Sequence, residues 1–171
     1  MHQISFTPKE RNAVREYAER LSSGINDEED KRRRRVGQFG AIAFYLFLLK
    51  NQRLPLGSDG KPIHKKDDDV AWMEFQTEDG KVVGIRTASK DYYRRILVSI
   101  DEFRTNPKDY YVGVRISEDE RWANIEGYAT RKDIRESEVV NPGEGKAYGC
   151  LLDDLRGITK LLNLFPASPR T

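Results

Sequence analysis

The chain has 171 residues, of which 30 are Lys or Arg, 28 are Asp or Glu, two are His and one is Cys. A single Cys excludes a disulfide framework and a zinc site built from several Cys, and two His leave little for a His-rich metal site. The length predicts a single domain, 1–171, that is large enough to form a hydrophobic core without such cross-links.

Two helices are expected first. Thr7, Pro8 and Glu10 form a capping pattern followed by apolar residues at helical spacing, which predicts an N-terminal helix within residues 1–24. A second helix is expected from about residue 31 to residue 50. It begins with KRRRR and continues as an apolar stretch, so we expect it to be buried in the middle of the domain. Gly37 and Gly40 within it predict a close neighbour on one side.

From residue 69 the hydrophobic period changes to two, which predicts strands. The expected strands are residues 71–76, 82–88, 95–100, 110–116 and 122–128, with a turn at Asp79-Gly80. A short helix capped by Thr130 and a C-terminal helix at 150–165 follow. This order predicts an α+β fold, with a single mixed sheet of about five strands, a buried helix and flanking helices.

The N-terminal segment lacks the apolar core of a signal peptide. The apolar run at residues 41–49 is shorter than the roughly 20 residues that a membrane span needs. We therefore expect a cytoplasmic protein with no membrane partner.

Charge is distributed unevenly along the chain. Residues 1–30 carry four basic and seven acidic side chains, whereas residues 31–66 carry ten basic and one acidic. Such a basic block is typical of proteins that bind a phosphate backbone, although short basic runs also occur as solvated helix faces. The expected nucleic-acid-binding residues are Arg32, Arg33, Arg34, Arg35, Lys65, Lys66, Arg94 and Arg95.

Five short stretches have the order of a known nuclease pattern: GQFG at 37–40, DDDV at 67–70, VGIRT at 83–87, DYYV at 109–112 and IEGYAT at 125–130. Together they resemble the PD-(D/E)xK, or restriction-endonuclease-like, nuclease superfamily. The resemblance covers about residues 36–136 and implies a restriction-endonuclease-like core at 31–136. In this family two acids hold a divalent cation and a lysine orients the attacking water or stabilises charge, chemistry that suits Mg²⁺.

The sequence departs from the family pattern at three positions. Gln38 stands in place of the helix Glu, Gly84 in place of the second metal-binding acid, and Arg86 in place of the lysine. The remaining acid is Asp69 or one of its neighbours Asp67 and Asp68, and Asp69 is the candidate metal ligand. Glycine offers no side-chain ligand and arginine cannot act as a base, so the resemblance implies weakened or lost catalysis and no cofactor.

The length of the turn between the first two strands decides which residues meet. An even number of turn residues would place Asp69 on one face with Gly84 and Arg86, and Lys90 would follow on that face. With three or five turn residues, Glu74 would join Arg86 instead and could replace the missing acid. The candidate catalytic residues are therefore Asp69, Glu74, Arg86 and Lys90, while the simpler interpretation of Asp69 and Arg86 is an ordinary cross-strand ion pair.

Three functions remain open at this level. The first is a nucleic-acid-binding protein, with DNA as the expected partner, on a nuclease-like scaffold whose catalysis is weakened or lost. The second is an active endonuclease with migrated catalytic residues and Mg²⁺ as cofactor. The third is a module that binds a protein partner in conflict between phage and host. Salt-dependent DNA binding would separate the first from the third.

One feature of the expected fold does not fit the family. The superfamily core usually has a substantial helix between its third and fourth strands, whereas residues 101–108 allow two turns at most. The alternative is a simple meander sheet with helices on one side, which would remove most of the case for nuclease ancestry.

Overall fold

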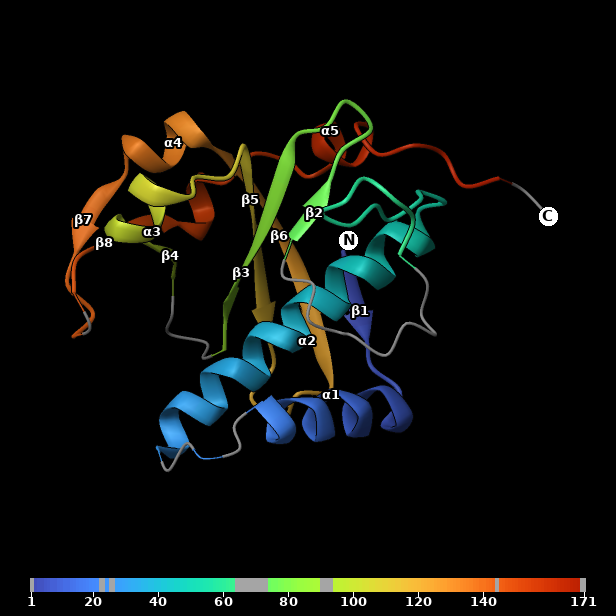
Figure 1. The fold of residues 1–171 in the computed structure, drawn as a ribbon, viewed down its shortest axis with the longest axis horizontal. Coiled ribbons are helices and arrows are strands. Elements are labelled where there is room, and N and C mark those ends of the chain that lie inside the picture. Colours follow the sequence, from blue (N-terminus) through green and yellow to red (C-terminus); the bar gives the residue numbers. More distant parts are fainter. Residues whose placement is uncertain are drawn as a thin grey trace.

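The computed structural model describes residues 2–21, 24, 27–63, 74–89, 94–143 and 145–169. Within them the chain forms an α+β fold, as predicted, with two sheets (Figure 1). In spatial order, the larger sheet contains β1 (Gln3–Ser5), β6 (Trp122–Thr130), β5 (Tyr110–Ile116), β3 (Val82–Ala88) and β2 (Glu74–Gln76). The smaller sheet contains β4 (Arg95–Ser99), β8 (Ala147–Leu151) and β7 (Glu138–Val140).

The longer helices begin at capping side chains, whereas the 3-10 turn and the last helix have no such cap. The helical elements are α1 (Pro8–Leu21), α2 (Glu28–Lys50), α3 (Ile100–Thr105), α4 (Arg131–Arg135), a 3-10 turn at Leu152–Asp154 and α5 (Thr159–Leu162). At the start of α1, the Thr7 amide donates to Glu10 at 2.9 Å and the Glu10 amide donates to Thr7 Oγ1 at 3.1 Å, which is the expected capping box. Thr130 and Asp133 form the same arrangement at α4. None of the described helices is both long and apolar enough to span a bilayer.

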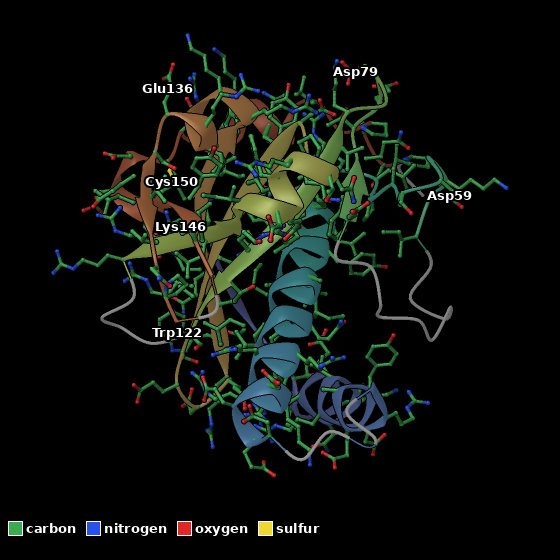
Figure 2. All side chains as sticks on the ribbon, turned by 60° about the vertical axis from the view of Figure 1, so that its left-hand side comes forward. Asp59, Asp79, Trp122, Glu136, Lys146 and Cys150 are labelled. Carbon is green, nitrogen blue, oxygen red and sulfur yellow. The ribbon has the colours of Figure 1, made fainter. Side chains whose placement is uncertain are left out.

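The two ends of the larger sheet carry different elements. Figure 2 shows Asp79, in the turn between β2 and β3, at one end of the molecule, and Trp122, at the start of β6, near the other. That second end is where α1 and the first turns of α2 lie (Figures 1 and 2). The turn between β5 and β6 therefore approaches the two N-terminal helices.

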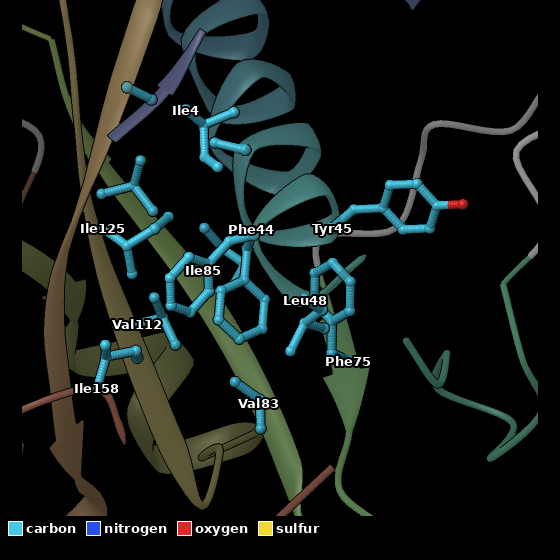
Figure 3. Close-up of a cluster of buried hydrophobic side chains, with 14 of the residues drawn as sticks. Ile4, Phe44, Tyr45, Leu48, Phe75, Val83, Ile85, Val112, Ile125 and Ile158 are labelled. Carbon is cyan, nitrogen blue, oxygen red and sulfur yellow. The ribbon is translucent and has the colours of Figure 1, made fainter. Parts of the chain in front are cut away.

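The main hydrophobic core lies between α2 and one face of the larger sheet (Figure 3). Phe44 is fully buried, and its ring centroid lies 5.1 Å from that of Phe75 on β2 and 5.8 Å from that of Phe165 near the C-terminus. Gly40 allows the helix to approach β3, since a Cβ there would lie 2.0 Å from Thr87 Oγ1. The buried central helix is confirmed, and so is the close approach to it at Gly40.

A second core lies on the other face of β5 and β6, beneath the smaller sheet. It contains Tyr111 from β5, Val98 from β4, Phe103 from α3 and Ile134 from α4, each at most 8% exposed. Cys150 on β8 is buried in the same core and packs as a small apolar side chain (Figure 2). The larger sheet thus has α2 on one face and the smaller sheet with α3 and α4 on the other.

The chain is not a simple meander. β3 and β5 are parallel neighbours, and the connection between them leaves the larger sheet to form β4 and α3. The strand expected at residues 95–100 exists as β4, but it pairs with β8 in the smaller sheet. α3 has six residues, which agrees with the two turns at most that the sequence allows.

The expected C-terminal helix at residues 150–165 is wrong. This segment forms the end of β8, a 3-10 turn and the four-residue α5. Its apolar residues divide between the two cores: Leu152 belongs to the second, whereas Ile158 belongs to the first. One straight helix could not place its apolar face in both cores, so the chain passes β6 on its way from the second core to the first. Two backbone hydrogen bonds of 2.8 and 3.0 Å join Arg156 to Tyr128 at this point.

Gly127 makes that crossing possible. Its φ is +149°, and a Cβ there would lie 2.4 Å from the Arg156 carbonyl oxygen. The remaining differences from the expected elements are smaller. β1 and β7 were not predicted, β6 extends to Thr130, and α2 begins at Glu28 with Asp27 as its cap.

Candidate functional site

The β2–β3 hairpin sets the first part of the candidate site. Glu74 pairs with Gly84 and Gln76 pairs with Val82, so the turn between the strands has five residues, 77–81. This is the odd-numbered case, in which Glu74 joins Gly84 and Arg86 on one face. Phe75 on the other face is fully buried in the main core beneath α2.

Glu74 is paired with a buried lysine. Its carboxylate accepts from Lys108 Nζ, and the Lys108 side chain is 6% exposed. Lys108 lies just before β5, and its backbone amide donates to Tyr111 Oη at 2.9 Å. A Cβ at position 84 would lie 3.0 Å from Lys108 Cγ, so the glycine there leaves room for the lysine stem. The Lys108 stem thus occupies the space that a side chain at position 84 would need.

Arg86 is held on the same face by three groups. Its guanidinium forms an ion pair with Glu102 of α3, donates to the Ile85 carbonyl oxygen at 2.9 Å, and lies 5.3 Å from the ring centroid of Tyr111. Burial raises the pKa of Tyr111, while the Lys108 amide and the Arg86 charge oppose that rise. Tyr111 is therefore a neutral hydrogen-bond partner at physiological pH.

The hairpin cluster, defined as Glu74, Arg86, Glu102, Lys108 and Tyr111, contains two acids that are each neutralised by a cation. Among the residues described, no group of three or more His, Cys, Asp or Glu could hold a metal ion. The cluster is arranged to position charged side chains against one another and to join the hairpin to α3.

The structure brings together two of the four candidate catalytic residues. Glu74 and Arg86 share the hairpin face. Asp69 and Lys90 lie outside the described residues, and so the possible metal ligand Asp69 does too. Gln38 belongs to α2, which packs on the opposite face of β3. Glu102, Lys108 and Tyr111 were missed, because nothing in the sequence shows that α3 and the start of β5 would meet the hairpin.

The basic block forms the first turns of α2, but its charge is partly neutralised. Because the helix begins at Glu28, three acids precede the arginines on the same helix. Lys31 lies 3.6 Å from Glu28, Arg32 lies 3.5 Å from Glu29, and Arg33 lies within 4 Å of Glu29 and Asp30. The count of ten basic residues to one acidic residue came from dividing the sequence between residues 30 and 31. That division separates acids and cations that lie three or four residues apart on the same helix and therefore pair.

A set of four cations lies around one side of α2. Lys31, Arg34 and Arg35 are three and four residues apart, so they share a helix face. Arg34 is exposed. Arg15 of α1 adjoins this face, and a depression of about 250 Å³ between the helices is lined by Arg15, Ala18, Glu19, Lys31 and Arg35. We call Arg15, Lys31, Arg34 and Arg35 the basic face.

The other predicted nucleic-acid-binding residues fall into three groups: two are bonded to other parts of the fold, one is exposed, and two lie outside the described residues. Arg32 points away from the basic face and donates to Ser89 after β3. Arg95 is occupied in the smaller sheet, where it donates to the Gly149 carbonyl at 2.7 Å and to Glu138 at 2.9 Å. Arg94 precedes β4 and is exposed, whereas Lys65 and Lys66 lie outside the described residues.

Comparison with known proteins adds no further information: no family model, curated protein or solved structure matches the chain.

Proposed function

We propose that this protein binds the phosphate backbone of nucleic acid through the basic face and that hydrolysis on its nuclease-like hairpin is weakened or lost. The observation that carries the proposal is the basic face itself: three of its four cations, Arg15, Lys31 and Arg35, line a depression with a single acidic lining residue, Glu19. Arginine forks and lysine ammonium groups neutralise phosphates without reading bases, so we expect little sequence preference.

The loss of hydrolysis is supported by the hairpin cluster. A metal-dependent nuclease site needs carboxylates that are free to bind a divalent cation. Glu74 is paired with Lys108, and Glu102 is paired with Arg86. Each cation stabilises its partner in place and competes with a metal ion for the same oxygens, so Mg²⁺ would have to break an ion pair before it could bind.

The binding test uses two double variants with equal loss of charge. Lys31→Ala with Arg34→Ala removes half of the basic face, while Lys146→Ala with Lys160→Ala removes two exposed lysines from other parts of the surface. Fluorescence anisotropy with labelled 20-nucleotide DNA and RNA is measured from 20 to 200 mM salt. Each phosphate contact contributes about 0.7–0.9 to the slope of log K against log salt concentration. The first variant should therefore lower the slope by about 1.4–1.8, and the second should leave it unchanged.

Two results would contradict the proposal. An equal loss of slope in both variants would show that only the overall charge matters. A wild-type protein that binds neither DNA nor RNA at 20 mM salt would favour a protein partner with an acidic surface.

A further inference from the structure

The basic face already holds an anion that belongs to the protein. Glu120, in the turn between β5 and β6, accepts from Arg35 Nε at 2.7 Å, and its other carboxylate oxygen lies 3.5 Å from Arg15 Nη2. Its side chain is only 12% exposed. A carboxylate from a distant turn therefore lies between α1 and α2 and bridges two of the cations that border the depression.

The backbone at Glu120 is unusual for a residue with a side chain. Its φ is +59°, in the left-handed region that favours Gly and, among other residues, Asn and Asp. A Gly or Asn here would close the same turn without strain. Residues held in such conformations persist where surrounding contacts fix them, and they concentrate at binding sites. The Glu120 amide donates to the Ser117 carbonyl oxygen at 3.0 Å within the turn, and the side chain is held by the two arginines.

Three cations meet at this point, and of the nearby acids Glu19, Glu28 and Glu120 only Glu120 is not exposed. Arg15, Lys31 and Arg35 line the depression, against Glu19 in the lining and the bridging Glu120. Lys31 has Glu28 at 3.6 Å, but that carboxylate is 87% exposed and its attraction is screened by water. An oxyanion larger than a carboxylate could contact all three cations at once.

We propose that Arg15, Lys31 and Arg35 form a binding site for a phosphate group, and that the Glu120 carboxylate occupies it in the free protein and leaves when the ligand binds. This inference rests on the proposed function and assigns a specific site to it. Phosphate and carboxylate oxygens accept the same arginine donors, so the two anions compete. Because Glu120 is tethered, its effective concentration is high, and it lowers the apparent affinity of the site.

The test compares Glu120→Gln with Glu118→Gln, a matched control. Glu118 is in the same turn and exposed, so its replacement removes the same charge without affecting the two arginines. A second variant, Glu120→Asn, removes the carboxylate and suits the left-handed backbone, so it preserves the turn. The probes are inorganic pyrophosphate in isothermal titration calorimetry and the single-stranded 20-nucleotide DNA in anisotropy, with thermal melts to verify folding.

We expect both Glu120 variants to bind DNA about tenfold more tightly than Glu118→Gln, the equivalent of removing one competing charge contact. A parallel gain with pyrophosphate would show that the site takes any phosphate group, and a gain with DNA alone would assign it to a nucleic-acid backbone.

The two proposals can fail separately. If the wild type binds DNA through Lys31 and Arg34 but the Glu120 variants are no tighter than Glu118→Gln, the Glu120 inference is wrong and the proposed function stands. If neither the wild type nor the Glu120 variants bind either probe, both are overturned.

Discussion

Asp133 and Arg156 join α4 to the segment that follows β8. Arg156 donates from Nε and Nη2 to the two carboxylate oxygens at 2.7 and 2.9 Å. This bidentate contact, together with the amide and hydroxyl of Thr130, lowers the pKa of Asp133 from 3.8 to about 2. A carboxylate with a lowered pKa in the folded state stabilises the fold above pH 3.8, and that stabilisation disappears as the pH falls through about 2.

We therefore predict that Asp133→Asn lowers the free energy of unfolding by about 1 kcal/mol at pH 7, because the exposed Arg156 is screened by water. The difference from wild type should shrink as the pH falls from 4 to 2. Urea denaturation at several pH values measures both effects. Glu136→Gln is the control, since the Glu136–Lys132 pair is 3.9 Å long and well exposed. A pH-independent difference for Asp133→Asn would show that the ion pair does not contribute.

At the scale of elements, α2 supports the main core through its aromatic residues. Phe44→Ala should lower the free energy of unfolding by about 3–5 kcal/mol, because the side chain is fully buried and packs against Phe47, Phe75 and Phe165. Leu49→Ala on the same helix is the control. Leu49 is 42% exposed, and the loss there should stay below about 1 kcal/mol. Chemical denaturation gives both values, and equal losses would contradict the central position of the helix.

The sequence predicted elements best where the local pattern and the tertiary environment agree. β3 and β5 have the predicted bounds. The side chains of β3 alternate between the main core and the hairpin cluster, and those of β5 alternate between the two cores. The helix predicted for the C-terminal segment is wrong for the opposite reason. Leu152, Leu155 and Ile158 have helical spacing, yet the first two pack in one core and the third in the other. Periodicity alone cannot show that a chain passes between two cores.

At the scale of the whole molecule, the candidate site depends on contacts that local patterns do not encode. Turn parity limited the hairpin to two arrangements, and the structure has the one in which Glu74 joins Arg86. The cations and acids that complete each cluster come from elsewhere. Lys108 and Glu102 reach the hairpin because β3 and β5 pair in parallel, and Glu120 reaches Arg15 and Arg35 through the β5–β6 turn. Only the tertiary arrangement reveals these partners.

The arrangement of the whole hairpin cluster leads to a prediction about catalysis: wild-type protein should not cleave plasmid DNA with Mg²⁺ or Mn²⁺ above the level of Glu74→Ala or Asp69→Ala. Glu74 and Glu102 are each occupied by a cation, and Mg²⁺ keeps most of its water unless several free carboxylates converge on it. Gel electrophoresis of supercoiled plasmid measures nicking and linearisation.

A converse variant tests the same prediction by restoring an acid at position 84 and a lysine at position 86. Gly84→Asp with Arg86→Lys adds a carboxylate and removes the guanidinium that is paired with Glu102. The new Asp would lie against the Lys108 stem, where a Cβ is 3.0 Å from Lys108 Cγ, so we expect a loss of stability together with any gain in metal binding. Calorimetric titration with Mn²⁺ detects that gain.

Wild-type cleavage that disappears in Glu74→Ala would contradict the prediction, because it would make Glu74 a working catalytic residue despite its pairing with Lys108.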